Sequence, residues 1–258
     1  MVNEVKYVLE NFPGLKEIFF DDDTFNYRKQ RTLELCAELK KLKFTWSCTS
    51  RVTTDYETLK AMKEAGCRLL IVGYESGDPE ILKNIKKGAT VEMAKRFTEN
   101  CHKLGLLVHA DFIIGLPGET RETIRRTIDF AKSLDNETIQ VSIAHAYPGT
   151  EFYDYAKKNA LVNIGSMSDE QGHQLPNVIY PGILDEAEMV EWVERFYGEY
   201  YFRPKAAWRI VRKAIFDGKE RKRLYKEATE YLALRSKRKQ YVADKRAANA
   251  MNQAQERA

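Results

Sequence analysis

The sequence lacks the features that mark membrane proteins, secreted proteins and simple metal hydrolases. No apolar run approaches the roughly 18 to 20 residues that a membrane span needs. The start, MVNEVKYVLE, lacks the basic-then-apolar order of a signal peptide. The four histidines form no HxH or HExxH pair, which argues against an ordinary metal-dependent barrel hydrolase. We therefore expect a cytoplasmic protein, and peripheral contact with a membrane stays open.

Cysteine is scarce and widely spaced. The four cysteines, Cys36, Cys48, Cys67 and Cys101, form neither a CxxC pair nor a compact disulfide framework. No cysteine trio occurs at the spacing that binds an iron–sulfur cluster. We expect four reduced cysteines that behave as small hydrophobic side chains.

Charge is unevenly distributed along the 258 residues, although the formal net charge is only +4. Residues 203–246 contain 16 Lys and Arg against 5 Asp and Glu, whereas residues 1–202 contain 25 against 32. The basic segment suits contact with an anionic membrane surface or with a nucleic acid, and it equally suits a solvated helix face. A hydrophobic content of 43% is enough for a sizeable core.

Strand and helix patterns alternate along residues 1–160, which is typical of a parallel sheet with crossover helices. Strands are expected at 16–20, 43–48, 68–73, 108–114 and 138–144. Helices are expected at 2–11, 29–42, 55–65, 91–104, 120–134 and 151–159.

The alternation stops near residue 161. Residues 163–184 are predicted to form a loop, and helices are expected at 185–202, 205–216 and 219–247, before a frayed end. The sequence therefore predicts two parts, an α/β core over residues 1–160 and a basic, α-helical C-terminal extension over residues 161–258.

Polar or glycine-rich residues follow the expected strands, at the carboxyl ends where parallel sheets form ligand sites. The carboxylates of Asp21–Asp23 repel one another, so a metal ion or a ligand ammonium group could bind between them. The alternative is a solvated loop. Arg51 could clamp a carboxylate or a phosphate. Glu75 could accept hydrogen bonds from ribose hydroxyls, and the alternative is an ordinary loop carboxylate.

Two turns complete this set of strand ends. The stretch FIIGLPGET runs from a strand through Gly115–Gly118 into a helix, and a turn without side chains lets a ligand lie directly on the backbone. A purely structural turn is the alternative. The fifth strand ends in HAYPGT, in which we expect His145 to be a loop histidine.

In this order, the motifs resemble the core of the radical S-adenosylmethionine (SAM) enzymes. The resemblance covers residues 1–160 and rests on DDDTF, Arg51, GCRLLIVGYESGDPEIL, FIIGLPGET and AYPGTEFY. It is strongest to the subgroup that carries an N-terminal cobalamin-binding domain. The segments GHQLPNVIYPG and EYYFRPKAAWRIVRKA further resemble radical SAM proteins of hopanoid biosynthesis that are associated with cyclitol ether head groups.

The resemblance implies a partial (β/α)6 barrel of the TIM type, a [4Fe-4S] cluster, SAM, and cobalamin held by an N-terminal domain. It implies reductive SAM cleavage to a 5′-deoxyadenosyl radical, with an external reductant protein and a small-molecule or hopanoid-type lipid substrate. The alternative is an RNA-modifying protein, or one that binds nucleic acid or a membrane surface through its basic helices.

The same resemblance assigns positions to SAM. The aspartates would hold the methionine amino group, the acidic third strand end the ribose, and the two turns the adenine, while the arginine would meet the methionine carboxylate or the substrate. The implied residues are Asp21, Asp22, Asp23, Arg51, Glu75, Ser76, Ile114, Gly115, Pro117, Gly118, Ala146 and Tyr147.

One departure from the family concerns the cluster. The family holds it with CxxxCxxC in the loop after the first barrel strand, and this sequence has no such motif. Because the sequence opens on a helical pattern, we expect it to begin just after that loop, without the first strand. We therefore expect no metal ligands in this chain and no SAM cleavage by the chain alone, and no catalytic residue is assigned.

Overall fold

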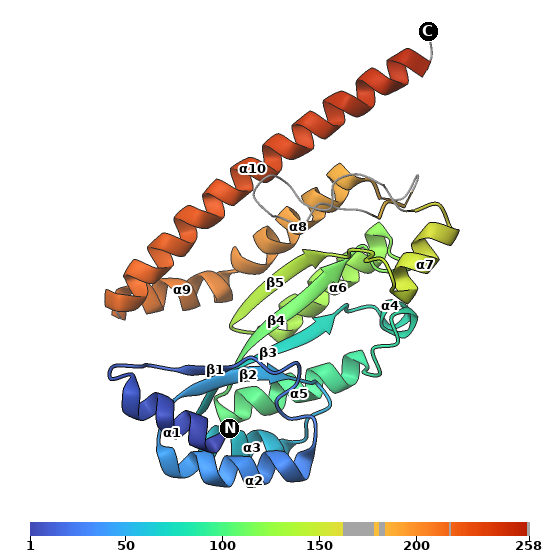
Figure 1. The fold of residues 1–258 in the computed structure, drawn as a ribbon. Coiled ribbons are helices and arrows are strands. Elements are labelled where there is room, and N and C mark those ends of the chain that lie inside the picture. The colour runs from blue at the N-terminus through green and yellow to red at the C-terminus, as the bar shows by residue number, and fades with distance from the viewer. Residues whose placement is uncertain (162–177, 181–183, 217, 257–258) are drawn as a thin grey trace. The chain divides into compact units, whose positions relative to one another are not determined.

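The computed structural model describes residues 1–161, 178–180, 184–216 and 218–256. Within them, one five-stranded sheet has the strand order β1-β2-β3-β4-β5. The strands are β1 (Ile18–Phe20), β2 (Trp46–Ser50), β3 (Cys67–Glu75), β4 (Leu107–Ile114) and β5 (Thr138–Ile143). The first four pair in parallel, each with the next, so the predicted α/β class is confirmed (Figure 1).

The chain divides into two compact units. The first comprises residues 1–112 and 133–140, and the second comprises residues 113–132 and 141–258. These compact units do not test the predicted boundary at residue 160, which stays a prediction. The predicted loop at 163–184 lies mostly outside the described residues.

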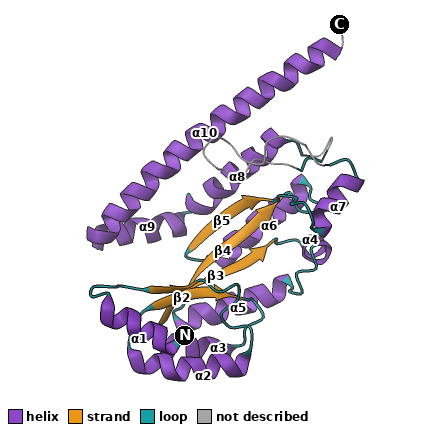
Figure 2. Ribbon diagram, in the orientation of Figure 1, coloured by secondary structure: helices purple, strands orange, loops and turns teal. Residues whose placement is uncertain are grey.

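Helices of the first unit cover one face of its strands (Figure 2). They are α1 (Val2–Asn11), α2 (Lys29–Leu39), the 3₁₀ turn η1 (Lys40–Leu42), α3 (Tyr56–Glu64) and α5 (Val91–Leu104), whereas α4 (Pro79–Asn84) lies beyond the end of β3. Asp55 caps α3 by accepting from Thr58 N, as its position before the apolar pattern predicts. The short helix α4 was not expected from the sequence. It begins where the Asp78 side chain accepts from Glu80 N and Ile81 N, with Pro79 in the first turn.

Strands β3 and β4 alternate in burial with a period of two residues. In β4, Ala110 and Phe112 are buried, whereas His109 and Asp111 point to the other face and are partly exposed. The opposite face of β3 likewise carries Glu75. The most buried side chains therefore lie on one face of these strands, and the other face mixes polar side chains with partly buried ones such as Ile71.

The second unit is largely helical beyond the last strand. Its helices are α6 (Arg121–Leu134, of which the last two residues belong to the first unit), α7 (Glu151–Lys158), α8 (Glu186–Tyr201), α9 (Pro204–Phe216) and α10 (Gly218–Glu256). This confirms the predicted helical extension. Helix α10 extends beyond the expected end at residue 247, through residues that we expected to be frayed.

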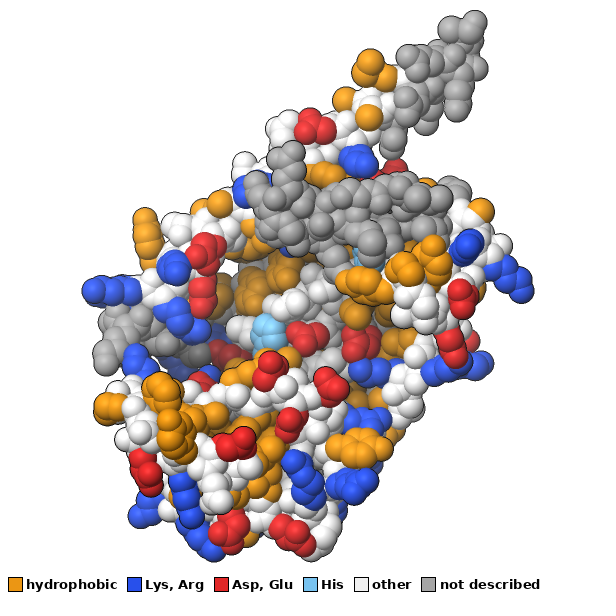
Figure 3. All heavy atoms as spheres, in the orientation of Figure 1, with side chains coloured by type: hydrophobic (Ala, Val, Ile, Leu, Met, Phe, Trp, Pro, Cys, Tyr) orange, Lys and Arg blue, Asp and Glu red, His pale blue; other side chains and the backbone are white. Residues whose placement is uncertain are grey.

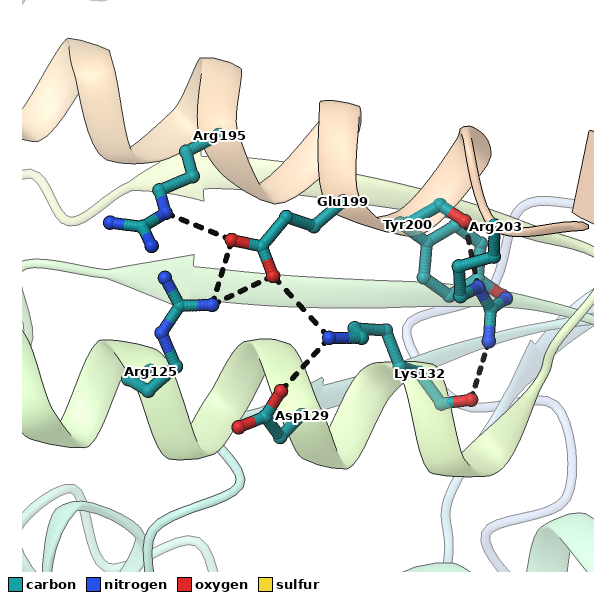
Figure 4. Close-up of polar contacts among 7 residues, drawn as sticks. All are labelled: Arg125, Asp129, Lys132, Arg195, Glu199, Tyr200 and Arg203. Carbon is teal, nitrogen blue, oxygen red and sulfur yellow. Dashed lines mark hydrogen bonds and ion pairs between the residues drawn. The ribbon is translucent and has the colours of Figure 1, made fainter.

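The extension buries apolar side chains of α8, including Phe196 and Tyr200, which have no exposed surface. Polar contacts join α8 to α6, as Figure 4 shows. Glu199 accepts from Arg125 Nη1 at 2.7 Å and from Arg195 Nε at 2.8 Å. No described helix is long and apolar enough to cross a membrane.

Candidate functional site

A pocket lies at the carboxyl ends of β1, β2 and β3, within the first unit. Its volume is about 940 Å³. Figure 3 shows acidic side chains gathered over this part of the molecule, near Lys and Arg side chains. The residues that line the pocket are Asp22, Asp23, Thr24, Tyr27, Arg28, Arg31, Thr49, Ser50, Arg51, Val52, Thr53, Ile71, Gly73, Glu75, Lys87, Ala89 and Asp111.

The loop that carries Asp22 and Asp23 is fastened to the neighbouring strand. Thr49 Oγ1 on β2 donates to the backbone carbonyl of Asp22 at 2.5 Å. Further along the loop, the buried Asn26 side chain donates to Ser50 Oγ and Thr54 Oγ1, each at 2.8 Å. These contacts hold the loop in place even though its two carboxylates repel each other.

The turn that carries Arg51 is closed by Thr54. Both the backbone N–H and the hydroxyl of Thr54 donate to the Arg51 carbonyl, at 3.1 and 2.7 Å. The guanidinium is therefore presented from a defined turn at the end of β2. Its planar set of donors suits a carboxylate or a phosphate.

Glu75 enters the pocket because the sheet is irregular at this point. The register between β3 and β4 shifts between Gly73 and Glu75, and Glu75 has a left-handed φ of 63°. Such a bulge re-aims the side chain that follows it. The Glu75 carboxylate accepts from Lys87 Nζ at 2.6 Å, and the two side chains are 16% and 29% exposed.

Gly73 makes room for this ion pair. A Cβ atom at residue 73 would lie 2.3 Å from Glu75 Oε1 and 3.1 Å from Lys87 Nζ. Both distances are shorter than ordinary van der Waals contacts. The absence of a side chain at residue 73 leaves space for the pair in this position, and a larger residue there would move the carboxylate.

A second polar pair lies on β4, next to the same pocket. His109 Nε2 lies 3.3 Å from Asp111 Oδ1, and His109 Nδ1 is 2.6 Å from the hydroxyl of Thr138. The threonine hydroxyl therefore holds the orientation of the imidazole ring. Asp111 lines the pocket, so this arrangement presents an acceptor to a ligand.

The glycine-rich turn that follows β4 belongs to the second unit. Ile114 is fully buried, and its carbonyl accepts from Ala144 N at 2.7 Å. Gly115 has a left-handed φ of 80°, and a Cβ there would lie 3.1 Å from Met189 Sδ. Gly118 also has a left-handed φ, of 88°. This backbone conformation favours glycine at both positions.

The Tyr180 side chain forms hydrogen bonds with the backbone of this turn. Its hydroxyl donates to the carbonyls of Gly115 and Leu116, at 3.0 and 2.8 Å. Burial is the largest cause of a raised pKa for Tyr180, so the phenol keeps its proton and remains a donor.

The other site residues predicted from the sequence lie in different environments. Asp21 is exposed and is not among the pocket-lining residues. Ser76 is buried, and its hydroxyl accepts from Asp78 N at 3.1 Å, which supports the start of α4. In the second unit, Ala146 is buried, whereas Tyr147 is 48% exposed, with its ring 4.7 Å from that of His145. Pro117 lies in the turn and is partly exposed.

The cysteines do not form a metal site. All four are free and buried. Burial raises the pKa of Cys36 to about 12, and it also raises the pKa values of Cys67 and Cys101. In the part of the chain that the structure describes, no three His, Cys, Asp or Glu side chains are grouped so as to hold a metal ion.

Sequence reasoning missed Lys87, Asn26 and Asp111. A signal for Asp111 was present, because strict alternation along β4 places it opposite the buried side chains. The signals for the other two were weaker. Lys87 lies in a turn between Lys86 and Gly88, both with left-handed φ, and the role of Asn26 depends on contacts with a distant strand.

The fold and the pocket together define an α/β protein with a parallel sheet and a polar pocket at the carboxyl ends of its strands. The family model described as Radical SAM superfamily matches residues 1–131. The chain belongs to the Radical SAM superfamily, a class of enzymes.

Two curated relatives illustrate the range of similarity. An uncharacterized methyltransferase of Pyrococcus horikoshii is 37% identical over 207 residues, which cover 79% of this chain and 44% of the relative. The bacteriochlorophyllide d C-12(1)-methyltransferase of Chlorobaculum tepidum is 26% identical over 151 residues, covering 56% of this chain and 33% of the relative. The chain thus spans less than half the length of these relatives.

Solved structures share the fold. TsrM from Kitasatospora setae, a radical SAM methyltransferase with cobalamin and a [4Fe-4S] cluster bound, matches with a TM-score of 0.63 and 22% identity. That match covers 79% of this chain and 46% of TsrM. The cobalamin-dependent radical SAM enzyme OxsB matches with a TM-score of 0.60 and 14% identity, covering 89% of this chain and 40% of OxsB. The likeness to these radical SAM structures shows that the sheet of this chain has the fold of a partial TIM-type barrel.

Proposed function

We propose that this chain forms the SAM-binding, substrate-facing part of a radical SAM enzyme. The observation that carries the proposal is the convergence of Asp22 and Asp23, Arg51 and the Glu75–Lys87 pair in one cavity of about 940 Å³. When bound, SAM supplies either a methyl group or a 5′-deoxyadenosyl radical, and the protein contributes binding, orientation and exclusion of water.

The pocket contains a partner for each polar part of SAM outside the base. The carboxylates of Asp22 and Asp23 suit the ammonium group of the methionine moiety and the positive charge on its sulfur. The guanidinium of Arg51 suits the methionine carboxylate, or an acidic group on the substrate. The Glu75 carboxylate, held by Lys87, suits the ribose hydroxyls. Asp111 remains available as an acceptor for a hydroxyl or amino group of the substrate.

The cysteines of this chain do not fit a [4Fe-4S] cluster. A cluster needs converging thiolates, whereas burial keeps the thiols of Cys36, Cys67 and Cys101 protonated. We therefore propose that the cluster ligands of the working enzyme lie outside these 258 residues, and we derive no catalytic step through the cluster. By this proposal the chain alone binds SAM without cleaving it.

Methyl transfer is the reaction class that we propose for the whole enzyme. It is supported by the 37% identity to a methyltransferase over 79% of the chain. Cobalamin as a second cofactor, held by another domain, is proposed by analogy with TsrM and OxsB, and a reductant protein completes the scheme. The substrate is proposed to be a small molecule. A hopanoid-type lipid remains a prediction of the sequence resemblance alone.

The direct test is calorimetric titration of the chain with SAM and with S-adenosylhomocysteine, which lacks the sulfonium charge. We expect both to bind, with SAM tighter because of the carboxylates. Arg51→Gln should weaken both ligands, since they share a methionine carboxylate. Arg68→Gln is the matched control, because Arg68 pairs with Glu17 outside the pocket. Failure of the unaltered, folded chain to bind either ligand would refute the proposal.

The turns of the second unit need a separate test. The sequence resemblance assigns the adenine to the backbone of Ile114–Gly118 and to Ala146 and Tyr147. Gly118→Val should then weaken SAM binding more than Gly149→Val does, because no atom lies within 4 Å of a Cβ at Gly149. Both positions have left-handed φ values, so their cost in backbone strain is comparable.

A further inference from the structure

Helix α9 exposes an apolar stripe that its own unit leaves uncovered. The stripe consists of Trp208, Val211 and Ile215, which are 65%, 46% and 61% exposed. Their spacing of three and four residues places them on one face of the helix. Ala206, by contrast, is fully buried on another face of α9. The helix therefore packs through one side and presents a second apolar side to its surroundings.

The first part of α10 also exposes apolar side chains. Tyr225 and Leu232 are 74% and 59% exposed and lie seven residues apart, on one face. Exposed cations nearby in the sequence include Arg212 on α9 and Arg221 and Lys222 on α10. Figure 3 shows hydrophobic side chains beside Lys and Arg side chains over α9 and the start of α10.

Acidic residues of α8 neutralise much of the charge on the far half of α10, whereas the pairs nearer its start, Arg223–Glu227 and Lys226–Glu230, lie within α10 itself. Arg238 pairs with Glu194 at 2.8 Å, and Lys245 pairs with Glu186 at 2.6 Å. In this half, several cations of the basic segment therefore have acidic partners on α8, although Arg246 remains 64% exposed. The excess of positive charge lies instead where the apolar side chains are exposed.

We propose that α9 and the start of α10 form a docking surface for an anionic lipid bilayer, with α9 lying in the interfacial plane. An interfacial helix combines exposed aromatic and aliphatic side chains with adjacent Lys and Arg, and both features occur here. The indole of Trp208 suits the headgroup level, since it has an apolar body and one polar N–H. This surface is separate from the SAM pocket and does not depend on it.

Charge and chemistry favour a bilayer over the two other occupants. A nucleic acid would neutralise the cations but would leave the side chains of Val211 and Ile215 without an apolar partner. A second copy of the chain, paired through the same surface, would bring like charges together. An anionic bilayer satisfies both the apolar and the cationic groups.

The test is sedimentation of the 258-residue chain with vesicles of phosphatidylcholine alone and with vesicles that contain about 30% phosphatidylglycerol. We expect binding to the anionic vesicles and a blue shift of Trp208 emission. Trp46 is fully buried, and the Trp192 ring lies against the guanidinium groups of Arg125 and Arg195, so Trp208 is the natural reporter. Trp208→Phe should keep the binding and lose the shift.

Two variants test the two parts of the surface. Replacing Trp208, Val211 and Ile215 with Ser should weaken vesicle binding by about 100-fold or more. Replacing Arg212, Arg221 and Lys222 with Gln should weaken it by about two orders of magnitude, since each cation near the surface contributes about fivefold.

The matched controls lie in the first unit. They are Tyr7→Ser with Phe12→Ser, which are 62% and 57% exposed in the parent, and Lys60→Gln with Lys103→Gln, and they should leave vesicle binding unchanged. The proposal is overturned if the folded chain ignores anionic vesicles. It is also overturned if the chain prefers RNA without a Trp208 shift, or if it forms an oligomer that the Ser variant abolishes.

Discussion

Lys87 Nζ donates to Glu75 Oε1 at 2.6 Å, and both side chains line the pocket at the carboxyl edge of the sheet. The two residues come from different places, one from the bulged end of β3 and one from the turn after α4. The lysine fixes a carboxylate that the bulge has already turned toward the pocket. This contact allows the binding proposal to be tested at single residues.

Glu75→Ala should weaken SAM binding by about 1–3 kcal/mol, because it removes a charged hydrogen-bond acceptor from a partly buried site. Lys87→Met should have a smaller effect in the same direction, since the carboxylate remains but loses its orientation. Calorimetric titration gives both values. Lys83→Met is the control for the lost charge, because Lys83 is 77% exposed and forms only a long surface pair. Equal affinity for SAM in all three variants and the parent would remove Glu75 from the site.

Gly73→Ala should reduce SAM affinity without unfolding the first unit. The new methyl group would lie 2.3 Å from Glu75 Oε1, so the carboxylate must move. We expect a loss of about tenfold, comparable to one misplaced charged hydrogen bond. Gly198→Ala is the opposite case, because no atom lies within 4 Å of its added Cβ and the residue is within α8. It should raise the free energy of unfolding by up to about 1 kcal/mol.

The chain alone should form no brown iron–sulfur chromophore on anaerobic reconstitution, and it should release no 5′-deoxyadenosine from SAM with a reductant. Its thiols should also react slowly with a thiol reagent at pH 8, because burial raises the pKa of Cys36 to about 12 and also those of Cys67 and Cys101. All four should react once urea unfolds the chain. Stable cluster formation would contradict this account, and Ser variants of each cysteine would then identify the ligands.

A fusion that places a CxxxCxxC segment from a relative before this chain should restore the chromophore and SAM cleavage together. The added thiolates would supply the cluster ligands, and this chain would supply the SAM pocket. Glu75→Ala in the fusion should keep the chromophore and lose SAM affinity. Loss of both would mean that Glu75 supports the fold rather than the ligand.

Stability of the second unit should fall in acid through Glu199. Burial raises its pKa, but hydrogen bonds from Arg125, Arg195 and Lys132 outweigh burial and lower it from 4.5 to about 2. The carboxylate therefore stabilises the folded state above pH 4.5, and this contribution is lost as the pH falls toward 2. After allowance for solvent screening, we expect Glu199→Gln to cost about 1–2 kcal/mol at pH 7.

Urea unfolding of the parent and of Glu199→Gln at pH 7 and at pH 3 tests this expectation. The difference between the two proteins should shrink at the lower pH. Glu122→Gln is the matched control, because Glu122 is 73% exposed and pairs with Arg126 on its own helix. A difference that does not change with pH would assign the effect to packing rather than to charge.

Much of the fold could be predicted from the sequence because its signals are local. The apolar patterns predicted the five strands and also helix ranges of 55–65 and 91–104, close to α3 and α5, which Asp55 and Gly105 cap in the structure. The strand ends also directed attention to Asp22, Asp23, Arg51 and Glu75, since parallel strands bring their carboxyl ends to one edge. Whether these residues bind SAM stays a prediction.

Only the tertiary structure decided which partners complete the pocket and where the basic charge lies. Lys87 and Asn26 act across the fold, through contacts with residues 12 and 24 or more positions away, and no local pattern encodes such contacts. The cations of α10 likewise divide between partners on α8 and the exposed surface according to packing. Sequence periodicity fixes which face of an element is apolar, whereas long-range packing determines what that face and its charges meet.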